Sequence, residues 1–173
     1  MEGFLNPNEV LKQLNLTKDM IAADFGCGSG GWTIPLAKIL QDGFVYAIDI
    51  LNEPLSALKS KADLERVRNI KTIRANLESK NGSTIADNSV DWVLMINLLF
   101  QLEQKGNVLE EAKRILKKGG KLLVIEWKVN SIQGPKEGKI SEEEAKKIAE
   151  DCGFELEKEF EAGYYHYGLI FKK

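Results

Sequence analysis

The sequence has few residues that could cross-link the chain or bind a metal. It contains two cysteines, Cys27 and Cys152, and one histidine in 173 residues. Two cysteines are too few for a disulfide framework, and a single histidine excludes a multi-histidine metal site. No apolar stretch of about 18 residues could span a membrane, and the N-terminus lacks the basic start of a signal peptide. We therefore expect a cytoplasmic protein with no metal and no membrane insertion.

Neither sign of charge predominates. The chain carries 24 Lys and Arg against 26 Asp and Glu, for a formal charge of −2 and a pI near 5.6. A protein that binds nucleic acid non-specifically normally has a basic face or tail, so nucleic acid is not a favoured partner. The length is that of one domain of ~100–200 residues. A single domain over residues 1–173 is therefore expected.

Apolar runs alternate with helical patterns along most of the chain, which is typical of a parallel sheet covered by helices. Residues 76–89 are polar and rich in Asn and Ser, which favours a loop. Strands are predicted at 21–25, 44–49, 70–75, 90–97 and 121–127, and helices at 32–40, from Asn52, at 107–116, and from Ser141 to Asp151.

The C-terminal end departs from this alternation. Two strand-like runs, 154–161 and 164–171, are separated only by Ala162 and Gly163. Two residues can close a hairpin but cannot make a crossover between parallel strands. The sequence therefore predicts an antiparallel last strand, the seventh in the chain.

A glycine loop follows the first predicted strand. Its pattern is Gly26-x-Gly28-x-x-Gly31, and Asp49 lies eighteen residues further on, at the end of the second strand. Glycines allow the turn to approach a ligand closely, and the following helix points its N-terminal amides at it. An acid at the tip of the second strand can accept both hydroxyls of a ribose. The combination predicts a ligand that contains adenosine.

Asp24 distinguishes between the adenosine cofactors. It stands two residues before Gly26, where its carboxylate would repel the pyrophosphate of a nicotinamide dinucleotide. S-adenosylmethionine carries an ammonium and a sulfonium instead, so the sign of the interaction is favourable. The predicted cofactor is therefore S-adenosylmethionine, and a nicotinamide-dependent oxidoreductase is disfavoured.

From about Leu16 to Lys173 the sequence resembles the class I S-adenosylmethionine-dependent methyltransferases. Within them it looks most like the group of ubiquinone/menaquinone-biosynthesis and other small-molecule methyltransferases. The glycine loop and the segments 45–49, 90–94 and 116–122 carry the resemblance. It implies an α/β fold: a Rossmann-like, doubly wound, seven-stranded sheet that is mostly parallel, with the antiparallel last strand between the fifth and sixth.

The resemblance also implies which residues bind the cofactor. Asp49 would bind the ribose hydroxyls, Ile50 and Asn76 would contact the adenine, and Asn97 would lie near the transferable methyl. The full set that it implies is Asp24, Gly26, Gly28, Ser29, Gly30, Asp49, Ile50, Asn76, Leu77 and Asn97.

Methyl transfer is an in-line displacement, so orientation alone can supply much of the catalysis. The reaction is expected at the carboxyl ends of the parallel strands. Glu126 and His166 are predicted at this edge and are the candidate catalytic residues. The alternative is a structural role, with Glu126 simply ending a strand and His166 hydrogen-bonded for packing. Aromatic residues predicted nearby favour a small-molecule acceptor that is aromatic or lipid-like: Phe100, Trp127, Tyr164 and Tyr165.

Two other functions stay open at this point. One is an RNA or protein methyltransferase with an open site, and the other is a non-catalytic module that binds S-adenosylmethionine. Residues 1–15, as a short N-terminal cap, and residues 128–139, as a substrate loop, are the only segments left to cover the site. If they do not, a second subunit in a homodimer or a large acceptor would have to close it.

Overall fold

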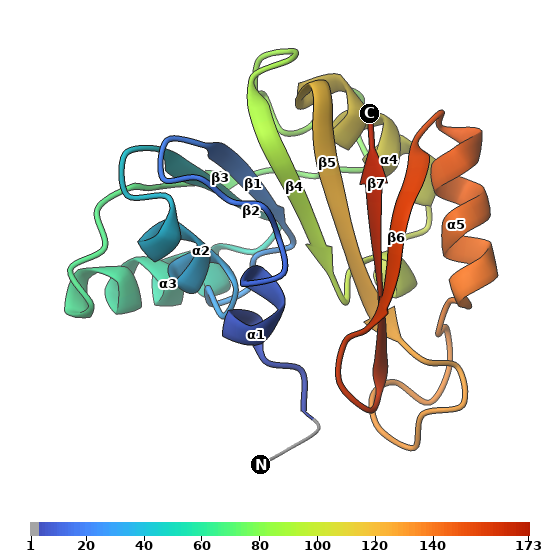
Figure 1. Ribbon diagram of the computed structural model, residues 1–173. Coiled ribbons are helices and arrows are strands. Elements are labelled where there is room, and N and C mark those ends of the chain that lie inside the picture. Colours follow the sequence, from blue (N-terminus) through green and yellow to red (C-terminus); the bar gives the residue numbers. More distant parts are fainter. Residues whose placement is uncertain (1–3) are drawn as a thin grey trace.

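The computed structural model describes residues 4–173, so the first three residues of the predicted N-terminal cap lie outside the described part. The chain folds into one seven-stranded sheet with helices on both faces (Figure 1). Its elements are α1 (Pro7–Leu11), β1 (Ile21–Phe25), α2 (Thr33–Ile39), β2 (Phe44–Asp49), α3 (Asn52–Leu64), β3 (Ile70–Arg74), β4 (Val90–Ile96), the 3₁₀ turn η1 (Leu99–Gln101), α4 (Lys105–Ile115), β5 (Leu116–Trp127), α5 (Glu142–Asp151), β6 (Glu155–Glu161) and β7 (His166–Lys172).

The strand order is β3-β2-β1-β4-β5-β7-β6, which leaves β3 and β6 at the two edges. β1 to β5 pair in parallel, whereas β7 is antiparallel to both β5 and β6. The predicted fold class is therefore confirmed, including the position of the last strand. Because the order reverses between β1 and β4, the ends of these two strands form the crevice where open α/β sheets bind ligands.

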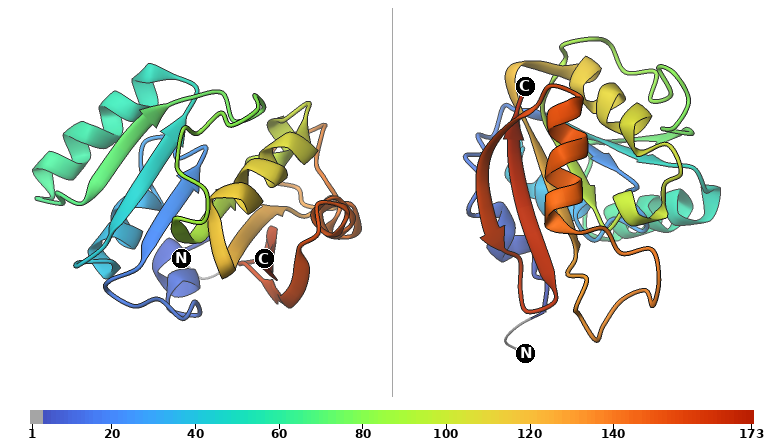
Figure 2. Two further views of the ribbon diagram at one scale, coloured as in Figure 1. Left: turned by 90° about the horizontal axis from the view of Figure 1, so that it is seen from above. Right: turned by 90° about the vertical axis from the view of Figure 1, so that its right-hand side faces the viewer.

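Two apolar clusters hold the helices to the sheet. On one face, side chains of α1, α2 and α3 pack on alternate sheet residues such as Leu123 and Ile125. On the other face, α4 and α5 pack on the intervening residues, such as Leu122 and Val124. Figure 2 shows α4 and α5 together on one side of β5, β6 and β7. Because successive side chains alternate between the two faces, this pattern also sets the face on which each side chain at the end of a strand lies.

The segment between β3 and β4 contains neither helix nor strand, as the sequence predicted. Its Leu77 and Ile85 pack into the same core as α4. Its buried Ser83 donates through its backbone N–H to Glu111 Oε1 over 2.9 Å, and its Asp87 pairs with Arg114. Polar anchors on α4 therefore hold this crossover in place of a helix.

Most boundaries differ by one or two residues from those predicted, and two of the differences change the structure of the site or the sheet. β5 begins at Leu116 rather than at residue 121, because Leu116 pairs with Val90. An irregularity in the pairing follows, and it contains the glycine turn at residues 119–120. β7 begins at His166 rather than at residue 164, so the hairpin turn covers residues 162–165 instead of two residues. Tyr164 consequently lies in the turn and is 69% exposed.

Candidate active site

The glycine loop leaves the end of β1 in a conformation that needs glycine. Gly26, Gly28 and Gly30 have φ angles of 70°, 50° and 88°, in the left-handed region that other residues rarely adopt. A Cβ on Gly26 would lie 2.8 Å from Leu98 Cδ1, and one on Gly30 would lie 2.2 Å from Leu58 Cδ1. Two glycines of the predicted loop are therefore fixed by close packing as well as by their backbone angles.

Asp49 holds the loop from the end of β2. Its Oδ2 accepts a hydrogen bond from the Gly28 N–H over 3.0 Å, and its Oδ1 accepts one from the Leu51 N–H, also over 3.0 Å. Each carboxylate oxygen has a second lone pair left to accept a further hydrogen bond. Asp49 can thus order the loop and still accept ligand hydroxyls.

A pocket of about 450 Å³ opens between this loop and the segments that follow β3 and β4. Six of the predicted cofactor residues line it: Gly26, Gly28, Asp49, Ile50, Asn76 and Leu77. Ile50 and Leu51 at its rim are 53% and 55% exposed. A mainly apolar lining with a few polar groups is typical of a binding site for a partly apolar ligand.

Four predicted cofactor residues lie outside the lining of this pocket. Ser29 accepts a hydrogen bond from Lys61 Nζ over 3.1 Å, and Gly30 packs on Leu58. Asp24 lies beneath the loop, and Asn97 lies just beyond β4. The sequence analysis also missed part of the wall, namely Leu98, Gln101 and Leu102. Their position directly after a strand of the carboxyl edge was the available signal.

Asp24 is buried on β1, where the Thr33 hydroxyl donates to its Oδ2 over 2.5 Å. Burial raises the pKa of Asp24 to about 7; the Thr33 hydrogen bond opposes this shift and the charge of Asp49 adds to it. A cation bound nearby would lower this pKa again. The surroundings of Asp24 therefore favour a positively charged ligand, as the sequence indicated.

His166 begins β7 next to the end of β5, and it is 4% exposed. Its ring stacks on Trp127 with the centroids 3.9 Å apart and the planes at 38°. Its Nε2 lies 3.3 Å from Nδ2 of Asn97. Burial, with a smaller effect of the Lys128 charge, lowers the pKa of His166 to about 4. The imidazole is therefore neutral at pH 7.

Asn97 follows β4 with a φ of 52°. Its N–H donates to Ile125 O over 2.7 Å, and its carbonyl oxygen accepts from Gln101 Nε2 over 2.6 Å. The backbone of Asn97 thus joins β5 to the η1 turn, while its side chain turns toward β7. This position places the amide beside His166.

Glu126 is fully buried, and its Oε1 accepts the Leu99 N–H over 2.5 Å at the start of η1. Burial raises its pKa to about 7, and this shift is opposed by hydrogen bonds from the Leu99, Leu98 and Phe100 amides. Along β5, Glu126 falls on the face that packs against α4, whereas Trp127 falls on the other face with His166. The two candidate catalytic residues therefore point to opposite sides of the sheet.

Three buried side-chain atoms in residues 4–173 lack a hydrogen-bond partner: Asn97 Oδ1, Glu126 Oε2 and His166 Nδ1. Leaving a buried polar atom unpaired costs about 1–3 kcal/mol, so most such atoms are paired in native proteins. All three lie at one edge of the sheet, where β4 and β5 end and the antiparallel β7 begins. Open α/β sheets bind their ligands at this edge. Unpaired polar atoms gathered there indicate groups that can bind a ligand.

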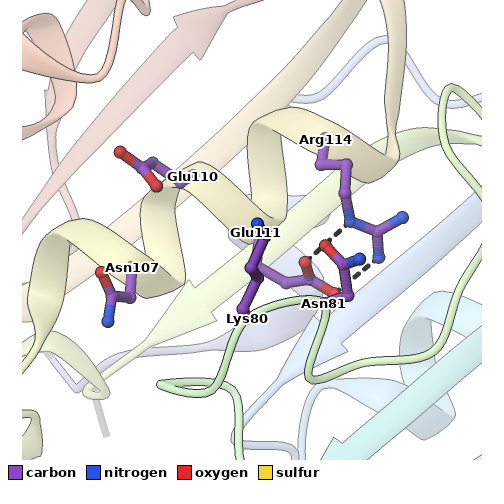
Figure 3. Close-up of a pocket in the computed structure, with 6 residues that line it drawn as sticks. All are labelled: Lys80, Asn81, Asn107, Glu110, Glu111 and Arg114. Atoms are coloured by element: carbon purple, nitrogen blue, oxygen red, sulfur yellow. Dashed lines mark hydrogen bonds and ion pairs between the residues drawn. The ribbon is translucent and has the colours of Figure 1, made fainter.

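A second hollow of about 440 Å³ lies over α4 and the 76–89 segment (Figure 3). The ion pair between Glu111 and Arg114, with 2.7 Å between Oε1 and Nη2, dominates it. Both side chains bind the 76–89 segment, through Ser83 and Asp87. None of the predicted site residues lines this hollow. We therefore regard it as part of the scaffold.

The seven-stranded order agrees with comparisons against known proteins. A family model described as "Methyltransferase domain" matches residues 23–124. The chain belongs to this methyltransferase family. The predicted resemblance to class I S-adenosylmethionine-dependent methyltransferases is thereby confirmed.

Similar proteins include both solved structures and curated sequences. A structure described as a SAM dependent methyltransferase from Aquifex aeolicus is 30% identical, covers 97% of this chain and 89% of that one, and has a TM-score of 0.89. A putative type 11 methyltransferase from Sulfolobus solfataricus is also 30% identical, with coverage of 88% and 83% and a TM-score of 0.72. A demethylmenaquinone methyltransferase from Geobacillus sp. (strain WCH70) is 30% identical over 68% of this chain and 50% of its own length.

This methyltransferase chain thus spans about half the length of the curated relatives it matches. Among the helices in residues 4–173, none combines the length and the apolar character needed to cross a bilayer.

Proposed function

We propose that the chain transfers a methyl group from S-adenosylmethionine to a small-molecule acceptor by in-line displacement. The observation that carries the proposal is the pocket between the glycine loop, Asp49 and Asn76, which opens at the reversal of strand order. The similar structure from Aquifex aeolicus, described as SAM dependent, supports the same cofactor.

The residues of the pocket fit this cofactor. Asp49 would accept the two ribose hydroxyls, while Ile50, Asn76 and Leu77 would surround the adenine. Gly26, Gly28 and the region above Asp24 would receive the methionine end. Its ammonium would attract the Asp24 carboxylate and offset the burial that raises the pKa of this group. Ser29 and Gly30 would support the loop from behind through Lys61 and Leu58. When bound, the cofactor supplies the electrophilic methyl group and a good leaving group.

The acceptor would lie over the ends of β4, β5 and β7, beside Asn97 and His166. His166 would contact the acceptor as a neutral hydrogen-bonding group. Glu126 would act differently, as a positioning residue. Its carboxylate receives the Leu99 N–H, and the η1 turn that it holds places Leu98, Gln101 and Leu102 in the cofactor pocket.

Calorimetric titration of the purified chain with S-adenosylhomocysteine, the product of the reaction, tests the cofactor. Saturable binding at one site is expected, and the absence of binding to the unmodified chain would overturn the proposal.

The acceptor class needs a second experiment. The chain is incubated with S-adenosylmethionine labelled on the methyl group, together with a cell extract divided into small molecules, RNA and protein. Label is expected in the small-molecule fraction. Label in RNA or protein would refute the acceptor class, and saturable cofactor binding without turnover in any fraction would indicate a binding module.

A further inference from the structure

The indole of Trp127 lies between two parts of the chain. His166 stacks on the ring with a centroid distance of 3.9 Å. A Cβ placed on Gly134 would lie 2.4 Å from Trp127 Cδ2, 2.7 Å from Cε3 and 2.8 Å from Cε2. These three distances put Gly134 directly above the ring plane. Because the imidazole already occupies one face of the indole, Gly134 must lie against the other.

This arrangement fixes His166 and excludes one way of binding an acceptor. With both faces of the indole covered, Trp127 cannot stack on an acceptor. Its aromatic character had suggested that it would form part of the acceptor site. Tyr165 is also engaged, since its ring centroid lies 6.0 Å from that of Phe4. Recognition near His166 therefore depends on polar atoms rather than on aromatic stacking.

The polar atoms can be counted without knowing how the Asn97 amide is oriented. If Nδ2 faces His166 it donates to Nε2, so the imidazole proton is on Nδ1. The pair then presents the His166 Nδ1–H as a free donor, besides the second N–H of Nδ2, and Asn97 Oδ1 as a free acceptor. If the amide is turned over, Oδ1 accepts from Nε2–H. Both N–H groups of Asn97 Nδ2 are then free to donate, and the free acceptor is His166 Nδ1. Either way at least one donor and one acceptor are unmet.

Within residues 4–173, the charged groups nearest the pair are already engaged and would not select an ion. Lys128, the cation that influences His166, is paired with Glu161. Glu126 is directed to the other face of the sheet under Leu99. A charged acceptor group would therefore be desolvated without a counter-ion, which is strongly unfavourable.

We propose that Asn97 and His166 form an uncharged recognition pair for a neutral acceptor carrying a group that both donates and accepts hydrogen bonds, as a phenolic hydroxyl does. Trp127 and Gly134 are positioning residues that hold the imidazole in one orientation. The inference rests on the proposed function, because the pair lies where the acceptor would meet the methyl group.

His166 is buried and Asn97 is half-buried, so the segments around them govern how an acceptor reaches the pair. Figure 1 shows the N-terminal segment, residues 128–139 and the β6–β7 turn at one end of the molecule, where β4 and β5 also finish. The Lys128 N–H donates to Tyr165 O over 2.8 Å, which joins two of these segments. Contacts between segments, rather than the sheet itself, close this end.

His166 is the only histidine in the chain, so its ring gives a single set of signals in nitrogen-15 NMR. The whole chain, saturated with S-adenosylhomocysteine, is titrated with phenol and with anisole, which cannot donate. Benzoate and benzylamine serve as charged probes. Phenol is expected to shift both ring nitrogens and to bind at least about tenfold more tightly than the other three, because each of them leaves a buried partner unmet.

Equal binding of anisole, preference for a charged probe, or no shift of His166 with any probe would each overturn the inference. These outcomes are distinct from failure of the proposed function, which is the loss of S-adenosylhomocysteine binding itself. The nitrogen shifts also show directly which nitrogen carries the proton.

Two variants separate recognition from folding. His166→Gln keeps a donor and an acceptor, whereas His166→Phe keeps only the ring. Phenol affinity, followed by ligand-observed NMR, is expected to stay within about threefold in the Gln variant and to fall at least about tenfold in the Phe variant. Trp127→Phe should leave S-adenosylhomocysteine binding intact but mix the two protonation forms of His166. Equal phenol affinity in both His166 variants, or an unchanged tautomer in Trp127→Phe, would contradict the roles assigned here.

Discussion

Glu126 and His166 lie at the ends of neighbouring strands, yet their side chains occupy opposite faces of the sheet. The pairing of β5 with β7 sets His166 beside Trp127, one residue beyond Glu126. The single-residue offset is enough to separate them, because successive side chains of a strand alternate between faces. A shared acid–base pair is therefore excluded in this structure. The Glu126 carboxyl binds the η1 turn on one face of the sheet. The His166 imidazole contacts Asn97 and Trp127 on the other face.

Removal of the Asp49 carboxylate should weaken cofactor binding by well over tenfold. Asp49→Ala loses both the predicted ribose contacts and the bonds to the Gly28 and Leu51 amides. Asp49→Asn keeps an acceptor oxygen and should lose less. Titration calorimetry with S-adenosylhomocysteine measures both, with thermal unfolding as the control for folding. Equal affinity in the Ala variant would remove Asp49 from the cofactor site.

Asp24 should release a proton when the cofactor binds near neutral pH. Its pKa of about 7 is expected to fall when an ammonium approaches, so about half a proton leaves at pH 7. Affinity should then rise with pH through this range. The released proton is measured by calorimetry in buffers of different ionisation enthalpy. The effect should vanish in Asp24→Asn; a buffer-dependent enthalpy that persists in that variant would point to another group.

Glu126 should make the chain less stable as pH rises. Its pKa is about 7 in the folded chain against an ordinary 4.5, so the folded state holds the proton more tightly. Its contribution is fully present below pH 4.5 and is lost by pH 7, a change of about 3 kcal/mol.

Glu126→Gln removes this titration while keeping an acceptor for Leu99. Relative to the parent chain, the variant should gain about 3 kcal/mol in free energy of unfolding between pH 4.5 and pH 8. Urea unfolding at several pH values measures the difference, which also cancels the similar contribution of Asp24. A difference that is constant with pH would show that Glu126 titrates normally.

Gly134→Ala tests the contact with the indole, and Gly138→Ala is its matched control. Both glycines lie in the 128–139 segment with φ angles of 84° and 79°. The nearest atom to a Cβ on Gly138 is Phe100 O at 3.6 Å, against 2.4 Å to Trp127 for Gly134. Both variants share the backbone strain, but Gly134→Ala should lose about 1–3 kcal/mol more stability, as overpacking does.

Chemical denaturation followed by tryptophan fluorescence measures both glycine variants. The tryptophan emission of the folded state, to which Trp127 contributes with Trp32 and Trp92, should change only in Gly134→Ala. Equal losses in the two variants would mean that the segment does not rest on the indole.

The parts of the site that depend on local sequence were predicted well. Gly26, Gly28 and Asp49 could be placed because a strand, a turn and an acid at fixed spacing set their positions directly. The antiparallel direction of β7 also followed from a local feature, the short connection before it, whereas its place between β5 and β6 came from the family resemblance. Each of these features is specified by a few consecutive residues, so one sequence was enough.

The parts that depend on distant contacts were not predictable. Leu98 and Leu102 reach the cofactor pocket because Glu126, on another strand, holds the intervening turn. Trp127 packs against Gly134 and His166 through contacts that its place in the sequence does not show. Leu116 joined β5 through pairing with Val90 across the sheet. Tertiary contacts decided all three, and periodicity does not report them.

The edge strand β6 bears on how two copies of this chain could associate. Its sequence alternates Glu155, Glu157, Glu159 and Glu161 with apolar residues and Lys158, and most of these side chains are exposed. Edge-to-edge pairing of two β6 strands would bring rows of carboxylates together, which charged edges are known to prevent. Growth of the sheet across a dimer is thus disfavoured at this edge, and any self-association must use a different surface.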